Sequence, residues 1–232
     1  MRLFGYLLAT ALSIALLVAS WGHHVEFDFS EAAAVVAGAW CVWLTVKENI
    51  WNWPIGNVSS FYFFVTFLHQ RLFADMTLQI VYIVLGFIGW YWWLHGGGNR
   101  STLGVSKTRP STALAIAFIL AGSTWAEYVY LVHIKDAAPF WDALTTGLSL
   151  AAQFMLTKKL IENWYVRITA DVIYIGLYIY KHLYLSSGLY TVFIVMCVMG
   201  LRAWKMSMET QNQKIDGVVV VDEGAWPPAP QR

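Results

Sequence analysis

Apolar residues along the chain gather into long runs, and polar residues fall mainly in the connections between them. A helix of about 20 apolar residues crosses the hydrocarbon core of a bilayer, and a shorter one suffices where its ends snorkel to the surface. The runs predict about eight membrane-spanning helices, near 3–21, 31–46, 55–70, 76–94, 112–134, 141–157, 166–184 and 188–204. The runs 31–46 and 141–157 are short and rich in small residues, which predicts that they pack inside the bundle.

Composition supports this interpretation. Of the 232 residues, 58% are hydrophobic and 12% are charged, whereas roughly a quarter of the residues of an ordinary soluble domain are charged. A soluble domain of this length could not bury so much apolar surface, so the predicted fold class is an all-α integral membrane protein. The net charge of +1 gives no argument for a nucleic-acid partner. Cys41 and Cys197 lie inside apolar runs, where they are expected to behave as small hydrophobic residues.

Lys and Arg residues are distributed unevenly among the connections. The connection after the first run carries acidic residues and neither Lys nor Arg, which assigns it to the outside. Alternation then places most cationic residues inside, namely Arg2, Lys47, Arg100, Lys107, Arg109, Lys158, Lys159, Arg202, Lys205 and Lys214. The outside receives Arg71, Lys135 and Lys181. This asymmetry predicts that both termini are cytoplasmic. The first run is expected to be a retained helix, with a cleaved signal peptide as the alternative.

Two stretches of the chain repeat one phrase, KENIWNWPIG at 47–56 and KKLIENWYVR at 158–167. An offset of 111 residues aligns 31–93 with 142–204 without a gap. The identities cluster at predicted helix ends and favour an internal duplication; they include Lys47/Lys158, Asn52/Asn163, Trp53/Trp164, Gly89/Gly200 and Trp93/Trp204.

Each copy of this duplication contains three predicted helices, so two adjacent copies would insert upside down relative to each other. The helix 112–134 between them restores the orientation. We therefore expect a 3+1+3 bundle with parallel repeats, preceded by an extra N-terminal helix. The expected parts are an N-terminal helix (1–22), a three-helix repeat (30–94), a cytoplasmic loop (95–111), a linking helix (112–134), a second three-helix repeat (141–205) and a disordered cytoplasmic tail (206–232).

Polar residues share one helical face in the run 141–157, where Asp142, Thr146, Ser149 and Gln153 follow helical spacing. Such a stripe lines either a cavity or a contact between helices. For Thr146 and Ser149 a hydrogen bond back to their own helix stays an equal alternative. The deep amide of Gln153 favours a cavity.

The run 166–184 carries Asp171, Tyr174 and Tyr178 at helical spacing. A carboxylate inside a bilayer has either a function or a partner, and Arg167, one turn earlier, is the alternative partner of Asp171.

Further candidates occur in the remaining runs. Asn57, Gln79 and Tyr82 lie within predicted spans, whereas Gln70, close to a connection, is equally explained as an interfacial residue. Trp53 and Trp164 are expected to anchor the chain at the membrane interface or, alternatively, to stack on a flat ligand. Trp125 belongs to a polar and aromatic patch in 112–134.

Several functional signatures are absent from the sequence. It contains no GxxxxGK[ST] phosphate-binding loop, no HExxH and no Cys-rich metal signature. We therefore expect no ATPase activity, no metal and no cofactor.

Three stretches resemble the PnuC family of vitamin transporters: RLFADMTLQIVYIVLGFIGWYWW, PFWDALTTGLSLAAQFMLTKKLIENW and LYLSSGLYTVFIVMCVMGLRAW. The resemblance covers roughly 25–205. It implies a uniporter of the bacterial cytoplasmic (inner) membrane that imports nicotinamide riboside by facilitated diffusion, with a cytosolic kinase trapping the product for NAD biosynthesis.

One departure from the family bears on the substrate. Where many members resemble Trp-x-x-Trp, this chain has Trp164-Tyr165-Val166-Arg167. A cationic Arg167 would repel a pyridinium ligand unless Asp171 neutralises it. Thiamine and riboflavin, which relatives of the family carry, therefore remain alternative substrates.

The expected substrate-binding residues are Trp53, Asn57, Gln70, Gln79, Tyr82, Trp125, Gln153, Trp164, Asp171, Tyr174 and Tyr178. Aromatic rings would stack on the flat ring of the vitamin, and the amides and the carboxylate would hold its polar groups. A membrane enzyme acting on a lipid and a sensor or assembly subunit are the rival hypotheses. Association into a homo-oligomer is left open.

Overall fold

The computed structural model describes residues 2–21, 29–69, 73–135, 138–180 and 184–223. These residues form α1 (Arg2–Trp21), α2 (Phe29–Val46), α3 (Asn52–His69), α4 (Phe73–His95), a short 3-10 turn η1 (Gly98–Arg100), α5 (Pro110–His133), α6 (Pro139–Thr157), α7 (Asn163–Tyr180) and α8 (Tyr184–Glu223). Each predicted run corresponds to one α-helix, and the all-α fold class is confirmed.

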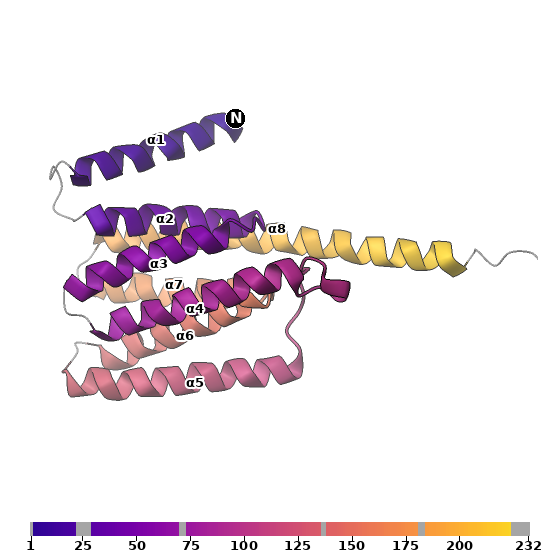
Figure 1. Ribbon diagram of the computed structural model, residues 1–232. Helices are drawn as coiled ribbons and strands as arrows, with labels where there is room; N and C mark the ends of the chain where they lie inside the picture. The colour runs from indigo at the N-terminus through magenta and orange to yellow at the C-terminus, as the bar shows by residue number, and fades with distance from the viewer. Residues whose placement is uncertain (1, 22–28, 70–72, 136–137, 181–183, 224–232) are drawn as a thin grey trace, which may run out of the picture.

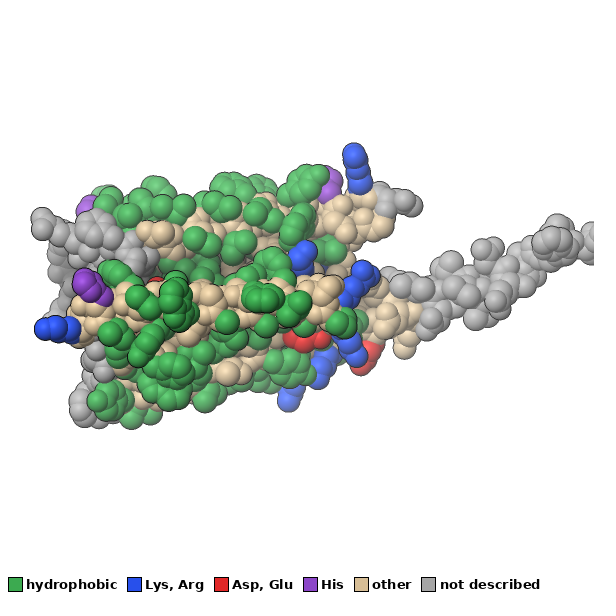
Figure 2. All heavy atoms as spheres, turned by 90° about the horizontal axis from the view of Figure 1, so that it is seen from below, with side chains coloured by type: hydrophobic (Ala, Val, Ile, Leu, Met, Phe, Trp, Pro, Cys, Tyr) green, Lys and Arg blue, Asp and Glu red, His purple; other side chains and the backbone are tan. Residues whose placement is uncertain are grey.

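The surface of the bundle is that of a multi-pass membrane protein. By length and hydropathy alone, the helical segments Phe29–Val46, Met76–His95, Pro110–His133 and Tyr190–Gln213 could each cross a bilayer. Figure 2 shows hydrophobic side chains along the flanks of the bundle and most of the visible Lys and Arg side chains gathered at one end. That end carries the loop between α4 and α5 and the projecting part of α8 (Figure 1).

The helices are arranged as two three-helix units, which we call unit 1 (α2–α4) and unit 2 (α6–α8). Within each unit consecutive helices pack together, while α5 packs on α6 and α1 on α2. The units meet where α4 packs against α6 and where α2 packs against α8. The two contacts are equivalent, because the offset of 111 residues relates α4 to α8 and α2 to α6. Figure 1 shows α2 and α6 running in the same direction, with α1 and α5 on opposite sides of the bundle.

The first helix of each unit ends in the same way. Glu48, after α2, has a φ of 52°, and Lys159, after α6, has a φ of 53°. The left-handed conformation costs a non-glycine residue roughly 1–2 kcal/mol, so other interactions must hold both residues in place. Both turns lead directly into the second helix of their unit, and they lie 111 residues apart.

The prediction of a disordered tail over 206–232 is wrong for its first part. Helix α8 continues without a break to Glu223, and residues 224–232 lie outside the described residues. The stretch KMSMETQNQK is rich in Lys, Met, Glu and Gln, which are favourable in helices. The extension also contacts the loop between α4 and α5, because the Gln211 side chain packs directly over Gly104.

Candidate functional site: a cavity between the two units

A cavity of about 600 Å³ lies between unit 1 and unit 2. Its volume falls within the range of roughly 300–1,000 Å³ that is usual for small-molecule sites. All six helices of the two units contribute to its wall, and the wall combines aromatic rings, amides, hydroxyl groups and two charged side chains. A second hollow, of about 530 Å³, is lined by Ala138, which directly precedes α6, and by residues of α6 and α7. None of these lining residues is charged. The cavity between the units is therefore the candidate site.

The cavity collects most of the residues that the sequence predicts for the site. Its wall includes Trp53, Asn57, Gln79, Tyr82, Gln153, Trp164, Asp171 and Tyr174. These residues come from α3, α4, α6 and α7, so residues far apart along the chain line one cavity. Gln70 lies outside the described residues. Tyr178 lies on α7, but its side chain lies outside the described residues.

Trp125 is placed differently from the expectation. Its side chain is 70% exposed on α5 and is not part of the cavity wall. Helix α5 packs against α6, and Trp125 lies on a part of α5 that this contact leaves uncovered. Helical periodicity alone does not reveal which face of a linking helix meets its neighbour.

Sequence reasoning missed several aromatic residues of the cavity wall: Phe63, Phe67, Tyr190 and Phe193. The internal repeat carried a signal for all four, because the offset of 111 relates them to predicted candidates: Phe63 to Tyr174, Phe67 to Tyr178, Phe193 to Tyr82 and Tyr190 to Gln79. A candidate in one unit thus indicates its equivalent in the other unit.

Aromatic rings stand on two sides of the cavity. In unit 2, the ring centroids of Tyr174 and Tyr190 are 4.7 Å apart, and those of Tyr190 and Phe193 are 5.6 Å apart. In unit 1, Phe63 and Phe67 are stacked with centroids 5.8 Å apart. Flat rings of this kind bury a large area and favour contact with a second flat ring.

The charged groups of the cavity wall, Arg167 and Asp171, both come from unit 2. The Arg167 guanidinium donates a hydrogen bond from Nη2 to Oε1 of Gln153, over 3.1 Å, which joins α7 to α6. The Cys197 thiol donates to Oδ2 of Asp171 over 3.7 Å. In the described part of the chain no ion pair joins Arg167 to Asp171, so the simple pairing of these two residues is not observed.

Unit 1 contributes the side-chain amide of Asn57, which packs against the backbone of α4. The Asn57 side chain lies directly against Gly86, where a Cβ atom would overlap the amide. Its Nδ2 donor is buried and has no hydrogen-bond partner among the described residues. A buried donor without a partner costs about 1–3 kcal/mol, so this amide would gain from a ligand acceptor.

Trp53 and Trp164 form the inner end of the cavity. They are 3% and 0% exposed, respectively, so neither is an interfacial anchor. Although both line the cavity, such deep burial leaves neither indole a free face for stacking on a ligand. Each indole fills the space over a glycine of its own unit, because a Cβ at Gly89 would overlap Trp53 and a Cβ at Gly200 would overlap Trp164.

A cluster of four indoles fills the space between the units at this end; the Trp cluster consists of Trp53, Trp93, Trp164 and Trp204. The ring centroids of Trp53 and Trp93 are 5.4 Å apart, as are those of Trp164 and Trp204. Trp93 and Trp204 meet each other across the units at 5.9 Å. The same edge-to-face arrangement therefore occurs in both units.

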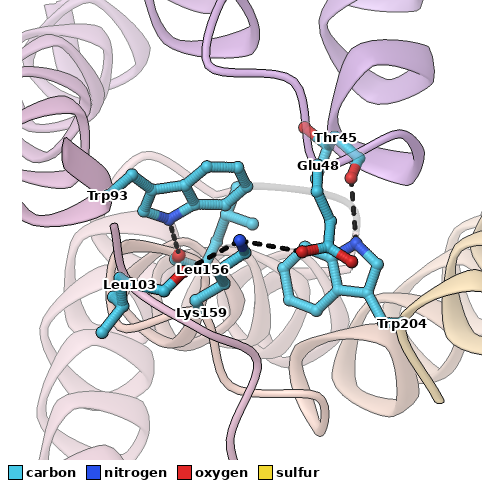
Figure 3. A network of polar contacts seen from close by, with 7 residues as sticks. All are labelled: Thr45, Glu48, Trp93, Leu103, Leu156, Lys159 and Trp204. Atoms are coloured by element: carbon cyan, nitrogen blue, oxygen red, sulfur yellow. Dashed lines mark hydrogen bonds and ion pairs between the residues drawn. The ribbon is translucent and has the colours of Figure 1, made fainter. Parts of the chain in front are cut away.

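Each unit also donates a hydrogen bond to the other (Figure 3). Nε1 of Trp93 donates to the carbonyl of Leu156 over 3.0 Å, and Nε1 of Trp204 donates to the carbonyl of Thr45 over 3.0 Å. The offset of 111 relates both donors and both acceptors. The last helix of each unit thus bonds to the end of the first helix of the other.

An ion pair crosses between the units beside the Trp cluster. Nζ of Lys159 lies 2.8 Å from Oε2 of Glu48 and donates to the carbonyl of Leu103 over 2.9 Å (Figure 3). The ammonium also lies 4.7 Å from the centroid of the Trp93 ring. These interactions hold Glu48 and Lys159 in the left-handed conformation. Together with the Trp cluster they close this end of the cavity, which we call the closed end.

The loop between α4 and α5 forms hydrogen bonds with the turn that carries Lys159. The backbone of Ser106 exchanges hydrogen bonds with Lys159 and Ile161. The hydroxyl of Thr108 donates to Oε2 of Glu162 over 2.7 Å. The loop is therefore docked onto the turn between α6 and α7.

Comparison with known proteins assigns this architecture to a family. The family model described as nicotinamide mononucleotide transporter matches residues 28–206. The nicotinamide riboside transporter PnuC of Escherichia coli (strain K12) is 23% identical over 215 residues, which cover 82% of this chain and 90% of that protein. The riboflavin/roseoflavin transporter RibM of Streptomyces davaonensis is 21% identical over 191 residues, covering 81% of this chain and 89% of that protein.

A solved structure has the same fold. The crystal structure of the vitamin B3 transporter PnuC matches this chain with a TM-score of 0.62 and 18% sequence identity, over 88% of this chain and 92% of that one. The family match spans both three-helix units and the linking helix. The chain therefore belongs to the nicotinamide mononucleotide transporter family and is a transporter of the PnuC type.

Proposed function

We propose that this protein is a carrier that imports a vitamin by facilitated diffusion across the bacterial cytoplasmic membrane. The vitamin would consist of a flat ring joined to a hydroxylated chain, and nicotinamide riboside is the first candidate. The observation that carries this proposal is the cavity of about 600 Å³ that lies between two three-helix units and is lined by all six of their helices. Three of the relatives that match this chain are named nicotinamide riboside transporter PnuC and come from different bacteria.

The aromatic wall would hold the flat ring, with Tyr82 and Tyr174 as the contacts that the sequence predicts. The amides of Asn57, Gln79 and Gln153 would bond the hydroxyl groups and the carboxamide. Support comes from the position of these residues in one wall and from the unpaired Nδ2 of Asn57. Trp53 and Trp164 would support the inner end of the site instead of stacking on the ligand, since both are deeply buried.

Alternating access would require the closed end to open. Separation of the units there breaks the bonds from Trp93 to Leu156 and from Trp204 to Thr45, as well as the ion pair of Lys159. Each neutral hydrogen bond contributes a net of about 1 kcal/mol, so a rocking motion of the units would face a cost of a few kcal/mol at this end. A cost of that size keeps a minor state measurably populated.

The closed end would face the cytoplasm. Lys and Arg side chains gather there (Figure 2), in agreement with the preference of cytoplasmic connections for these residues. Both termini would then be cytoplasmic as well. Transport would need no ATPase and no catalytic step in this chain.

Riboflavin is the second candidate substrate, and a specific observation favours it. The cavity wall contains the Arg167 guanidinium, which suits a ring with carbonyl acceptors better than a pyridinium cation. One relative of the chain is named as a riboflavin/roseoflavin transporter. Thiamine carries a cationic ring and lacks this support.

An uptake assay tests the proposal. The purified protein is placed in sealed liposomes without ATP, and uptake of radiolabelled nicotinamide riboside and riboflavin is followed with excess unlabelled nicotinamide riboside, riboflavin or thiamine. We expect saturable uptake that stops at equal concentrations on both sides, because facilitated diffusion cannot concentrate its substrate. If none of the three vitamins enters or competes, the proposed substrate class is wrong. Release of a chemically altered product in detergent would favour the rival membrane enzyme.

A further inference from the structure

Charge is distributed asymmetrically in the cavity. Among the described residues of its wall, Arg167 and Asp171 are the charged ones, and both belong to α7. The equivalent residues of unit 1, at the offset of 111, are Gly56 and Ser60, which also line the cavity. The cationic side chain of unit 2 therefore faces no counterpart across the cavity.

The guanidinium of Arg167 is held in position but keeps free donor capacity. Arginine has five N–H donors, and one of them, at Nη2, is engaged by Gln153. Its Nε is buried without a hydrogen-bond partner among the described residues. The tether to Gln153 fixes where the charge lies, and the remaining donors favour a ligand that offers oxygen acceptors.

Asp171 does not neutralise this charge by direct contact. Its carboxylate accepts from the Cys197 thiol, and it does not form an ion pair with Arg167. A ligand beside Arg167 therefore meets a positive charge that is compensated only from a distance. Beside protein, where the effective dielectric constant is below that of bulk water, such a charge acts more strongly on a charged ring.

We propose that Arg167 is a specificity-determining residue that makes the cavity prefer an uncharged, acceptor-bearing ring to a permanently cationic ring. This inference rests on the proposed function and reorders its candidates: it places riboflavin, with an uncharged ring, ahead of nicotinamide riboside, with a cationic ring. An uncharged ring accepts hydrogen bonds from the guanidinium without repulsion, whereas a pyridinium ring is repelled. Asp171 acts in the opposite direction and sets how strongly the cation is disfavoured.

Nicotinamide riboside and its reduced form, dihydronicotinamide riboside, are a suitable pair of probes. The two compounds share the ribose and the carboxamide, and the reduced form differs by an uncharged ring. Equilibrium binding of each compound to the purified protein gives two Kd values, and their ratio measures discrimination by charge. The ratio is determined for the natural chain and for Arg167→Gln, Arg167→Lys and Asp171→Asn.

We expect the natural chain to bind the reduced form at least tenfold more tightly than the cation. Arg167→Gln should lower this ratio by about tenfold, which corresponds to about 1.4 kcal/mol, because it removes the charge and keeps polar atoms. Arg167→Lys should keep the ratio, since it preserves the charge. Asp171→Asn should raise the ratio. If Arg167 has only a structural role, both variants of Arg167 should instead bind both compounds more weakly and by the same factor.

An unchanged ratio in Arg167→Gln, with both compounds still bound, overturns this assignment and leaves the carrier function intact. If the natural chain, folded and monodisperse, binds neither compound and does not bind riboflavin, both the assignment and the proposed function fail.

Discussion

The two three-helix units agree at one end of the bundle and differ in the cavity. At the closed end, Trp53 and Trp164 pack over equivalent glycines with equivalent geometry. In the cavity wall, equivalent positions hold different residues: Gly56 and Arg167, Ser60 and Asp171, Val42 and Gln153, Gly38 and Ser149.

This difference has a physical reason. At the closed end the last helix of each unit meets the first helix of the other, so one interaction is used twice and both copies need the same residues. A vitamin has no twofold symmetry, and its two sides need different partners. The cavity positions are therefore free to diverge, and in this chain both charged residues of the described wall lie in unit 2.

Glu48 and Lys159 are an instructive exception at the closed end. They occupy equivalent positions in the two units and contact each other. Two residues of like charge there would repel each other, so charged residues that meet their own equivalent must be opposite in charge. Trp93 and Trp204 also meet across the units, and as uncharged rings they can be identical.

The largest effect at the closed end is expected from Gly200→Leu, which tests the packing of the Trp cluster. A side chain at this position would overlap the Trp164 indole, and overpacking of a filled space destabilises by about 1–3 kcal/mol or more. We expect little folded protein in size-exclusion chromatography. Gly176→Leu is the control, because a Cβ at Gly176 meets nothing within 4 Å. A normal Tm for Gly200→Leu would contradict the described packing. Gly89→Leu should behave like Gly200→Leu.

The second test exchanges the charges of the ion pair. Lys159→Glu places two carboxylates together, and loss of a buried pair of this kind costs roughly 3–5 kcal/mol; we expect somewhat less, because the side chain of Glu48 is 21% exposed. The double variant Glu48→Lys with Lys159→Glu should recover a large part of the loss in Tm. If the double variant is as unstable as the single one, the pairing itself contributes little, and the bond to Leu103 matters more.

The third test addresses the cavity, where the units differ. Asn57→Ala removes the unpaired donor, and we expect about a tenfold increase in KM for uptake, equivalent to about 1.4 kcal/mol, with little change in Tm. Trp125→Leu, on the exposed face of α5, is the matched control and should change neither quantity. Equal effects of the two variants on uptake would argue that Asn57 has no contact with the substrate.

The smallest effects are expected from Trp93→Phe and Trp204→Phe, measured separately. Each variant removes one hydrogen bond between the units, worth about 1 kcal/mol, together with part of an indole contact. The two changes in Tm should be similar because the hydrogen bonds are equivalent, with a slightly larger loss for Trp93→Phe because the Lys159 ammonium also lies over the Trp93 ring. A large difference between them would show that the closed end is less symmetric than its geometry suggests.

Much of the architecture could be predicted from the sequence, because it depends on local properties. The length of an apolar run decides whether a helix crosses the membrane. The offset that relates Trp53 to Trp164 is visible in the chain itself. The resemblance to the PnuC family rested on such stretches, and the family match bears it out.

The site was predictable only in part. The polar residues within apolar runs pointed to Gln79, Gln153 and Asp171, which lie in the cavity wall. The same reasoning selected Trp125, because a polar and aromatic patch is also found on a helix face that points away from the bundle. Spacing defines the face of a helix but not the neighbour that the face will meet.

The sequence by itself thus determined where the helices lie and which positions the offset of 111 relates, since these follow from apolar length and from identities along the chain. Only the tertiary structure decided that Trp53 and Trp164 are buried instead of interfacial. It also decided that Arg167 is held by Gln153 while Asp171 receives the thiol of Cys197. These outcomes depend on contacts between helices that are distant in the chain, and such contacts leave no local periodicity to read.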